Sequence, residues 1–185
     1  MEFVHKPYIQ GETIAAIATA PGEGGIAVIR ISGKESCQVA SKIFSKNVES
    51  LKSHTAHYGI IKTMNGEKID EVLLLVMKGP RSFTGEDTVE IQCHGGRLVS
   101  RHVLEAAIQA GARAARPGEF SFTAFMNGKL DLARAEAIQT LIHAKNEKAL
   151  QYAQEQLDGA LSKKVLSFQK RLTEVAAILE AWVDF

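Results

Sequence analysis

A chain of 185 residues with 45% apolar content is long enough to bury a sizeable core, which excludes an intrinsically disordered protein. Its 22 basic and 21 acidic residues leave a formal net charge of +1, so it lacks the broad positive surface that dominates nucleic-acid affinity. We therefore expect this segment alone to hold an RNA partner only weakly.

Cysteine usage and the distribution of apolar residues indicate the compartment. Cys37 and Cys93 form neither a metal-ligand spacing nor a disulfide framework, and we expect no bound metal. The first residues lack the pattern of a secretory signal, and no segment approaches the roughly 18 apolar residues of a membrane span. We expect a soluble, cytoplasmic protein with no membrane partner.

The first 116 residues alternate short apolar runs with turn residues, as in a mixed α/β domain. Helical spacing is expected over 34–45 and 97–111, the latter ending at Gly111. Five segments rich in strand-forming residues predict strands, namely residues 13–20, 25–33, 57–64, 71–79 and 87–95.

The composition changes after Pro117, the last proline of the chain. From Asp131, a predicted N-cap, the sequence favours helix throughout. Apolar residues from Leu157 to Trp182 recur at intervals of three and four, which predicts one stripe of a long amphipathic helix. We expect two domains, residues 1–118 and 119–185. The apolar ending WVDF predicts that the natural chain continues.

Glycine-rich segments raise the question of phosphate binding. A P-loop needs Gly, four residues and then Gly-Lys-Ser/Thr, but Gly33-Lys34 precedes Glu35 and Gly128-Lys129 precedes Leu130. No GTP site is therefore expected. The segment PGEGG at 21–25 is either a connection between strands, the more frequent role, or a backbone cradle for an anion.

Two charged residues of predicted strands have more than one explanation. Arg30 lies in the apolar strand AVIRISG, so it either pairs with an internal carboxylate or faces a ligand pocket. Glu90 fits a surface edge strand as well as a buried carboxylate that accepts two adjacent N–H donors, as on a pterin ring or a guanidinium.

Lys129 follows a predicted helix stop at Asn127-Gly128 and is either an ordinary exposed lysine or a loop contact to a ligand. Cys93 and His94 are neighbours on a strand and point to opposite faces, so they do not favour a nucleophile pair or a metal site. No catalytic residue is expected.

Three segments, residues 13–33, 83–96 and 116–137, together resemble the MnmE/TrmE family in order and spacing. The third, with its RPGEF and NGKLDLA sequences, is the most specific. The resemblance implies a folate-binding domain related in fold to aminomethyltransferases, which forms a homodimer. It also implies that long helices follow as the first part of a helical domain, which the G domain of this family interrupts later in the chain.

The resemblance further implies a role in tRNA modification. Members of this family are GTPases that act with the flavoprotein MnmG (GidA) to place an aminomethyl or carboxymethylaminomethyl group on C5 of wobble uridine 34. The one-carbon donor is 5-formyl- or 5,10-methylene-tetrahydrofolate. GTP, Mg²⁺ and K⁺ belong to the G domain, which this chain lacks, so the chain alone is expected to be inactive.

The folate-binding residues of the family correspond to Arg30 in its VxRxSG strand, Glu90 at the end of GEDxxE and Lys129 in NGKLDL. We expect Glu90 to accept hydrogen bonds from the pterin, and Arg30 and Lys129 to hold the glutamyl tail or the formyl oxygen. Many relatives have arginine where Glu23 and Thr123 stand, which puts contacts to phosphate or RNA there in doubt. Two alternatives are another folate-dependent aminomethyltransferase and a non-catalytic dimerisation module.

Overall fold

The computed structural model describes residues 8–183, which form two compact units. The first unit ends at Lys129 and the second begins at Leu130. The segment 1–7, in which no signal sequence is expected, and the last two residues of the WVDF ending lie outside the described residues.

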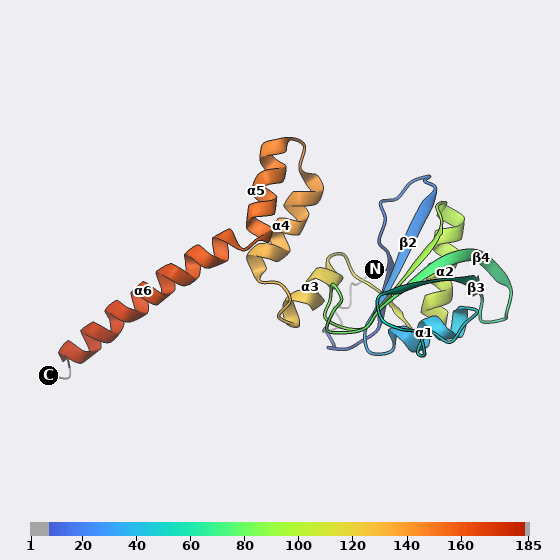
Figure 1. Cartoon of the computed structure of the whole chain (residues 1–185), viewed down its shortest axis with the longest axis horizontal. Coiled ribbons are helices and arrows are strands. Elements are labelled where there is room, and N and C mark those ends of the chain that lie inside the picture. The colour runs from blue at the N-terminus through green and yellow to red at the C-terminus, as the bar shows by residue number, and fades with distance from the viewer. Residues whose placement is uncertain (1–7, 184–185) are drawn as a thin grey trace, which may run out of the picture. The chain divides into compact units, whose positions relative to one another are not determined.

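A six-stranded mixed sheet with the order β3-β4-β5-β2-β1-β6 organises the first unit (Figure 1). All neighbouring strands are antiparallel except β1 and β6, which are parallel. The predicted mixed α/β fold is confirmed, with all five expected strands; β6 was not predicted, because two residues are too short to show a periodicity. The strands are β1 (Ile14–Ile17), β2 (Ile26–Ser32), β3 (Thr55–Lys62), β4 (Lys68–Met77), β5 (Thr88–His94) and β6 (Arg113–Ala114).

Two helices, α1 (Ser36–Ile43) and α2 (Arg97–Gln109), pack against the sheet and form one core with it (Figure 1). Alternate strand residues such as Ile29 and Ile91 point into this core and are fully buried. Because side chains alternate across a strand, the residues between them face away from α1 and α2. The sheet therefore has a second face, on which polar side chains can be placed.

The helix α3 (Glu119–Met126) belongs to the first unit, so the boundary expected after residue 118 falls later in the structure, after Lys129. The physical reason is burial, because Thr123 and Ala124 are almost fully enclosed. The Asn127 side chain also donates a hydrogen bond to the Thr84 carbonyl over 2.8 Å. The helix stop predicted at Asn127-Gly128 is confirmed.

The second unit consists of α4 (Leu132–His143), α5 (Glu147–Leu157) and α6 (Ala160–Val183). Asp131 caps α4 as predicted, since its carboxylate accepts a hydrogen bond from the Arg134 backbone N–H over 2.9 Å.

The prediction that one helix continues through Leu157 is wrong, because the chain turns at Gly159 with φ +80° and α6 starts afterwards. None of the described residues of α6 is buried. Within residues 8–183, no helix is both long and apolar enough to cross a membrane.

Candidate functional site

Arg30 and Glu90 lie directly opposite each other on β2 and β5, on the sheet face that α1 and α2 leave uncovered. Arg30 Nε donates to Glu90 Oε1 over 2.8 Å, and Nη2 lies 2.7 Å from the same oxygen. Of the two explanations for an arginine in this apolar strand, the structure shows pairing with an internal carboxylate. The edge-strand explanation of Glu90 is wrong, because β5 lies between β4 and β2.

The ion pair is enclosed but leaves hydrogen-bonding capacity unused. The side chains of Arg30 and Glu90 are only 24% and 16% exposed. No hydrogen bond among the described residues reaches Glu90 Oε2 or Arg30 Nη1. The pair therefore presents an acceptor and a donor without partners among the described residues, in a partly desolvated position where hydrogen bonds to charged groups are strong.

Two phenylalanine rings cover the Arg30 guanidinium. Its Cζ lies over the Phe83 ring, 5.3 Å from the centroid, and over the Phe120 ring at 5.5 Å. Phe83 comes from the loop between β4 and β5, and Phe120 from the first turn of α3. Sequence reasoning assigned neither ring a role, although FTGED and RPGEF, which contain them, are motifs of the resemblance.

Hydroxyl groups hold the loop of Phe83 on the sheet. The Ser32 hydroxyl lies 2.7 Å from that of Thr84 and 3.1 Å from that of Thr88, and all three side chains are fully buried. Because Thr84 directly follows Phe83, this cluster fixes the backbone next to the ring.

Lys129 contacts the same loop but not the ion pair. Its Nζ donates to the Pro80 carbonyl over 2.9 Å, and its side chain passes Gly85. No contact with Arg30 or Glu90 is present among the described residues. An open cavity of about 630 Å³ lies along this loop, lined by Gly85 and Asn127 among others. The assignment of Arg30, Glu90 and Lys129 to one ligand stays a prediction.

A buried carboxylate holds the start of α3. Glu119 is 7% exposed and accepts hydrogen bonds from Arg113 Nη2 over 2.6 Å, Arg113 Nη1 over 3.1 Å and the Arg116 backbone N–H over 2.6 Å. Burial alone would raise the pKa of Glu119, but these hydrogen bonds outweigh it and hold the pKa below its ordinary value. Arg113 also donates to Glu12 Oε2 over 2.9 Å. Sequence analysis did not identify this cluster.

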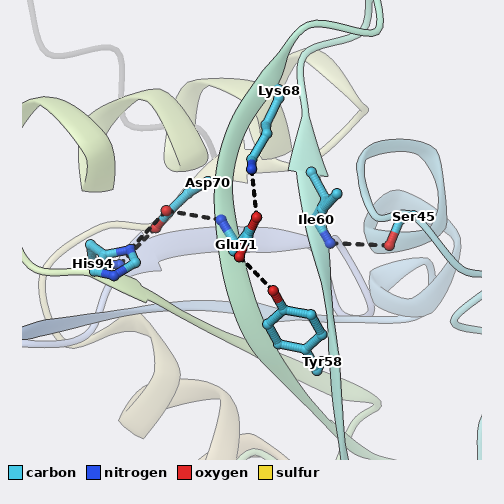
Figure 2. Close-up of polar contacts among 7 residues, drawn as sticks. All are labelled: Ser45, Tyr58, Ile60, Lys68, Asp70, Glu71 and His94. Atoms are coloured by element: carbon cyan, nitrogen blue, oxygen red, sulfur yellow. Dashed lines mark hydrogen bonds and ion pairs between the residues drawn. The ribbon is translucent and has the colours of Figure 1, made fainter.

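A second polar cluster lies on β3, β4 and β5 (Figure 2). His94 Nδ1 lies 2.8 Å from Asp70 Oδ1, and the His94 side chain is 73% exposed. Glu71 accepts hydrogen bonds from Tyr58 and Lys68. His94 thus pairs with a carboxylate and not with Cys93, as the strand geometry predicted. The described His, Cys, Asp and Glu residues contain no group of three that could hold a metal.

The two thiols are expected to be unreactive in the folded protein. Cys93 is 2% exposed, and burial, helped by the charge of Asp70, raises its pKa to about 11; burial also raises the pKa of Cys37. At pH 8 the thiolate fraction of Cys93 is about 100-fold or more below that of a free thiol. Labelling with a thiol-specific chromogenic disulfide should be correspondingly slow in buffer and complete in denaturant. Fast labelling of either thiol in buffer would contradict the prediction.

The segment PGEGG connects the antiparallel strands β1 and β2, which is the first of its two predicted roles. A Cβ added to Gly95 would lie 2.1 Å from the Gly24 carbonyl oxygen, so the close approach of this connection explains the glycine at position 95. Glu23 is exposed there, whereas Thr123 is buried and is not placed to contact RNA.

Residues 13–129 match the family described as GTP-binding protein TrmE N-terminus, and residues 132–185 match the MnmE helical domain. The first match ends at residue 129 and the second begins at residue 132, close to the boundary between the two compact units after Lys129. The mixed sheet and the following helices thus correspond to two successive domains of one protein family. The chain belongs to the TrmE/MnmE family, and the resemblance seen in its three motifs is confirmed.

Relatives that carry the name tRNA modification GTPase MnmE include proteins of three different genera. The protein of Protochlamydia amoebophila is 66% identical over 185 residues, covering 100% of this chain and 40% of that protein. The Chlamydia abortus protein is 54% identical, and the match covers 96% of this chain and 40% of that protein. The Symbiobacterium thermophilum protein is 53% identical, and the match covers 94% of this chain and 39% of that protein. The chain thus spans about 40% of the length of the curated relatives it matches.

Proposed function

We propose that this chain is the folate-binding part of a tRNA-modifying GTPase. The partly buried Arg30–Glu90 pair carries the proposal. The edge of a pterin ring has an amide N–H and an amino group beside a carbonyl oxygen. Glu90 Oε2 offers the acceptor and Arg30 Nη1 the donor that such an edge requires, and neither atom has another hydrogen-bond partner among the described residues. Phe83 and Phe120 supply apolar surface beside them.

Lys129 completes the proposed site from the next loop. Its ammonium group, which donates to the Pro80 carbonyl, has further N–H donors that would hold the glutamyl tail or the formyl oxygen of the folate. Charge-assisted hydrogen bonds of this kind contribute about 1.5–3 kcal/mol each. The bound tetrahydrofolate, as its 5-formyl or 5,10-methylene form, would supply a one-carbon unit, while the residues of this chain bind and orient it.

In the whole protein we propose that this carbon reaches C5 of wobble uridine 34 in tRNA, in the cytoplasm and together with the flavoprotein MnmG. GTP, Mg²⁺ and K⁺ would be bound by a G domain outside this chain, because no Gly-Lys pair here has P-loop spacing. The relatives named tRNA modification GTPase MnmE support tRNA modification and GTPase activity. The net charge of +1 fits binding of tRNA mainly by other parts of the complex.

Isothermal titration with 5-formyl-tetrahydrofolate tests the proposal. The wild-type chain should bind, and Arg30→Ala should weaken binding by about 10–100-fold, because it removes a charged donor and leaves Glu90 unpaired. Arg101→Ala is the matched control, since Arg101 is exposed on α2 and pairs only with Glu105 among the described residues. Equal affinity of wild type and Arg30→Ala would contradict the site, and no binding at all would contradict the proposed function.

A non-catalytic dimerisation module is the second candidate. The apolar residues of α6, such as Leu172 and Trp182, are 70% and 83% exposed, as expected of a surface that another chain covers. A mass measurement of the oligomer made alongside the titration separates the candidates. A dimer without folate affinity would favour this module, whereas folate binding supports the first proposal. The family match argues against a separate glycine-cleavage type of aminomethyltransferase.

A further inference from the structure

Phe120 and Phe83 have flat apolar faces beside the Arg30–Glu90 pair, in which Glu90 Oε2 and Arg30 Nη1 have no hydrogen-bond partner among the described residues. The Phe83 side chain stays 36% exposed, and Phe120 is only partly buried, so neither ring is a core residue. Apolar and aromatic walls around a few convergent polar groups are typical of sites for small planar ligands. The rings therefore supply apolar surface next to the Arg30 guanidinium.

The position of Phe120 depends on the preceding residue. Glu119 is buried and takes three hydrogen bonds, two of them from the guanidinium of Arg113. A paired arginine fork fixes orientation as well as distance. Glu119 therefore holds the first turn of α3, and with it the backbone of Phe120.

The hydrogen-bonded pair of Arg113 and Glu119, called the clamp below, connects Phe120 with the strand that carries Arg30. Arg113 lies on β6, which pairs with β1 through Ile14, and β1 pairs with β2 so that Ala16 is opposite Arg30. The Phe120 ring is thus attached to the sheet through β6, and the Arg30 guanidinium is attached to the same sheet through β2. A loosened clamp would move the ring without breaking the Arg30–Glu90 pair.

We propose that Phe120 is a ring-contacting wall of the ligand site, and that Arg113 and Glu119 are positioning residues that hold it there. This inference rests on the proposed folate binding and extends it. It adds an aromatic contact to the pterin ring, and it adds the two residues that position the aromatic ring. It assigns no catalytic role to the clamp, which does not touch the ligand.

A double-mutant cycle read by titration with 5-formyl-tetrahydrofolate tests the proposal. Phe120→Leu should weaken binding by about 3–10-fold, the range expected for one aromatic contact. Glu119→Gln should weaken it by a similar factor. The double variant should bind no more weakly than Phe120→Leu alone, because the clamp acts through the ring. Both single variants should bind p-aminobenzoyl-glutamate, which lacks the pterin, as the wild type does.

Phe122→Leu is the matched control. Phe122 is two positions further along α3, so it points to the opposite side of the helix, and it contacts Tyr8 edge-on at 4.9 Å. It should keep the wild-type folate affinity. Far-ultraviolet circular dichroism and urea midpoints establish that each variant is folded, and Arg113→Lys, which keeps the charge but loses the fork, replaces Glu119→Gln in the cycle if the latter does not fold.

The outcomes separate the two proposals. If the wild-type chain binds folate and Phe120→Leu binds it equally well, the proposal that Phe120 contacts the ligand is wrong. If the losses of folate affinity in the double variant are additive, the positioning role of Arg113 and Glu119 is wrong, while the contact of Phe120 with the ligand still holds. A wild-type chain that binds no folate overturns the proposed function, and this inference falls with it.

Discussion

Replacing Glu90 with glutamine is expected to weaken binding of 5-formyl-tetrahydrofolate by about 100-fold or more. The substitution keeps the shape but replaces one carboxylate oxygen with an NH₂ group. The ion pair with Arg30 is lost in either orientation of the amide, and its NH₂ group meets a donor whether it faces the pterin or Arg30. Loss of two charge-assisted hydrogen bonds costs about 3 kcal/mol or more, and each 1.4 kcal/mol changes the dissociation constant tenfold. Isothermal titration measures the change.

Glu71→Gln is the control for this prediction. Glu71 is an exposed carboxylate on the adjacent strand β4, where it accepts hydrogen bonds from Tyr58 and Lys68 (Figure 2). Its replacement also removes one negative charge but should leave folate affinity unchanged. A Glu90→Gln variant that binds as tightly as Glu71→Gln would show that the Glu90 carboxylate does not contact the ligand.

Gly33→Ala should be among the most destabilising single substitutions in the first unit. Gly33 has φ +135°, and a Cβ there would lie 2.5 Å from the Thr13 Cα and 2.7 Å from the Glu12 carbonyl oxygen. Both are backbone atoms, so a side-chain rotation cannot relieve the collision. Backbone strain and overpacking together are expected to lower the free energy of unfolding by about 2–6 kcal/mol. Urea unfolding followed by circular dichroism measures the loss.

Gly66→Ala separates the collision from the backbone conformation. Gly66 also has a positive φ, +90°, but a Cβ there has no neighbour within 4 Å. It should lower the free energy of unfolding by only about 1–2 kcal/mol, the cost of placing alanine at positive φ. Equal losses in the two variants would mean that the chain near Thr13 moves aside to make room.

Local periodicity explains how much of the fold could be predicted. The strands from Ile14 to His94 and the helix beginning at Arg97 show alternation or helical spacing in their own sequence. The pairing of Arg30 with Glu90 could not be read in this way, because the two residues are 60 positions apart. Only the order of strands in the sheet brings them together, so both residues were recognised as unusual but not as partners.

The segment after Pro117 shows where local reasoning failed. The domain boundary predicted after residue 118 followed a change in composition, but α3 is held in the first unit by tertiary contacts of Glu119 and Asn127. Phe120 was missed as a site residue because an apolar residue in a helix has no sequence signal that separates a ligand wall from core. The break at Gly159 was missed because the apolar spacing continues across it.

The facing positions of Arg30 and Glu90 also affect how the sheet assembles. β2 and β5 must find each other although β3 and β4 lie between them in the sequence. A slip of one residue in β2 would turn Arg30 into the core and turn both Ile29 and Ile31 out of it. An unpaired buried guanidinium is strongly unfavourable. The pair thus rejects misaligned sheets during folding, so its loss should raise the yield of misfolded chains even where no ligand is present.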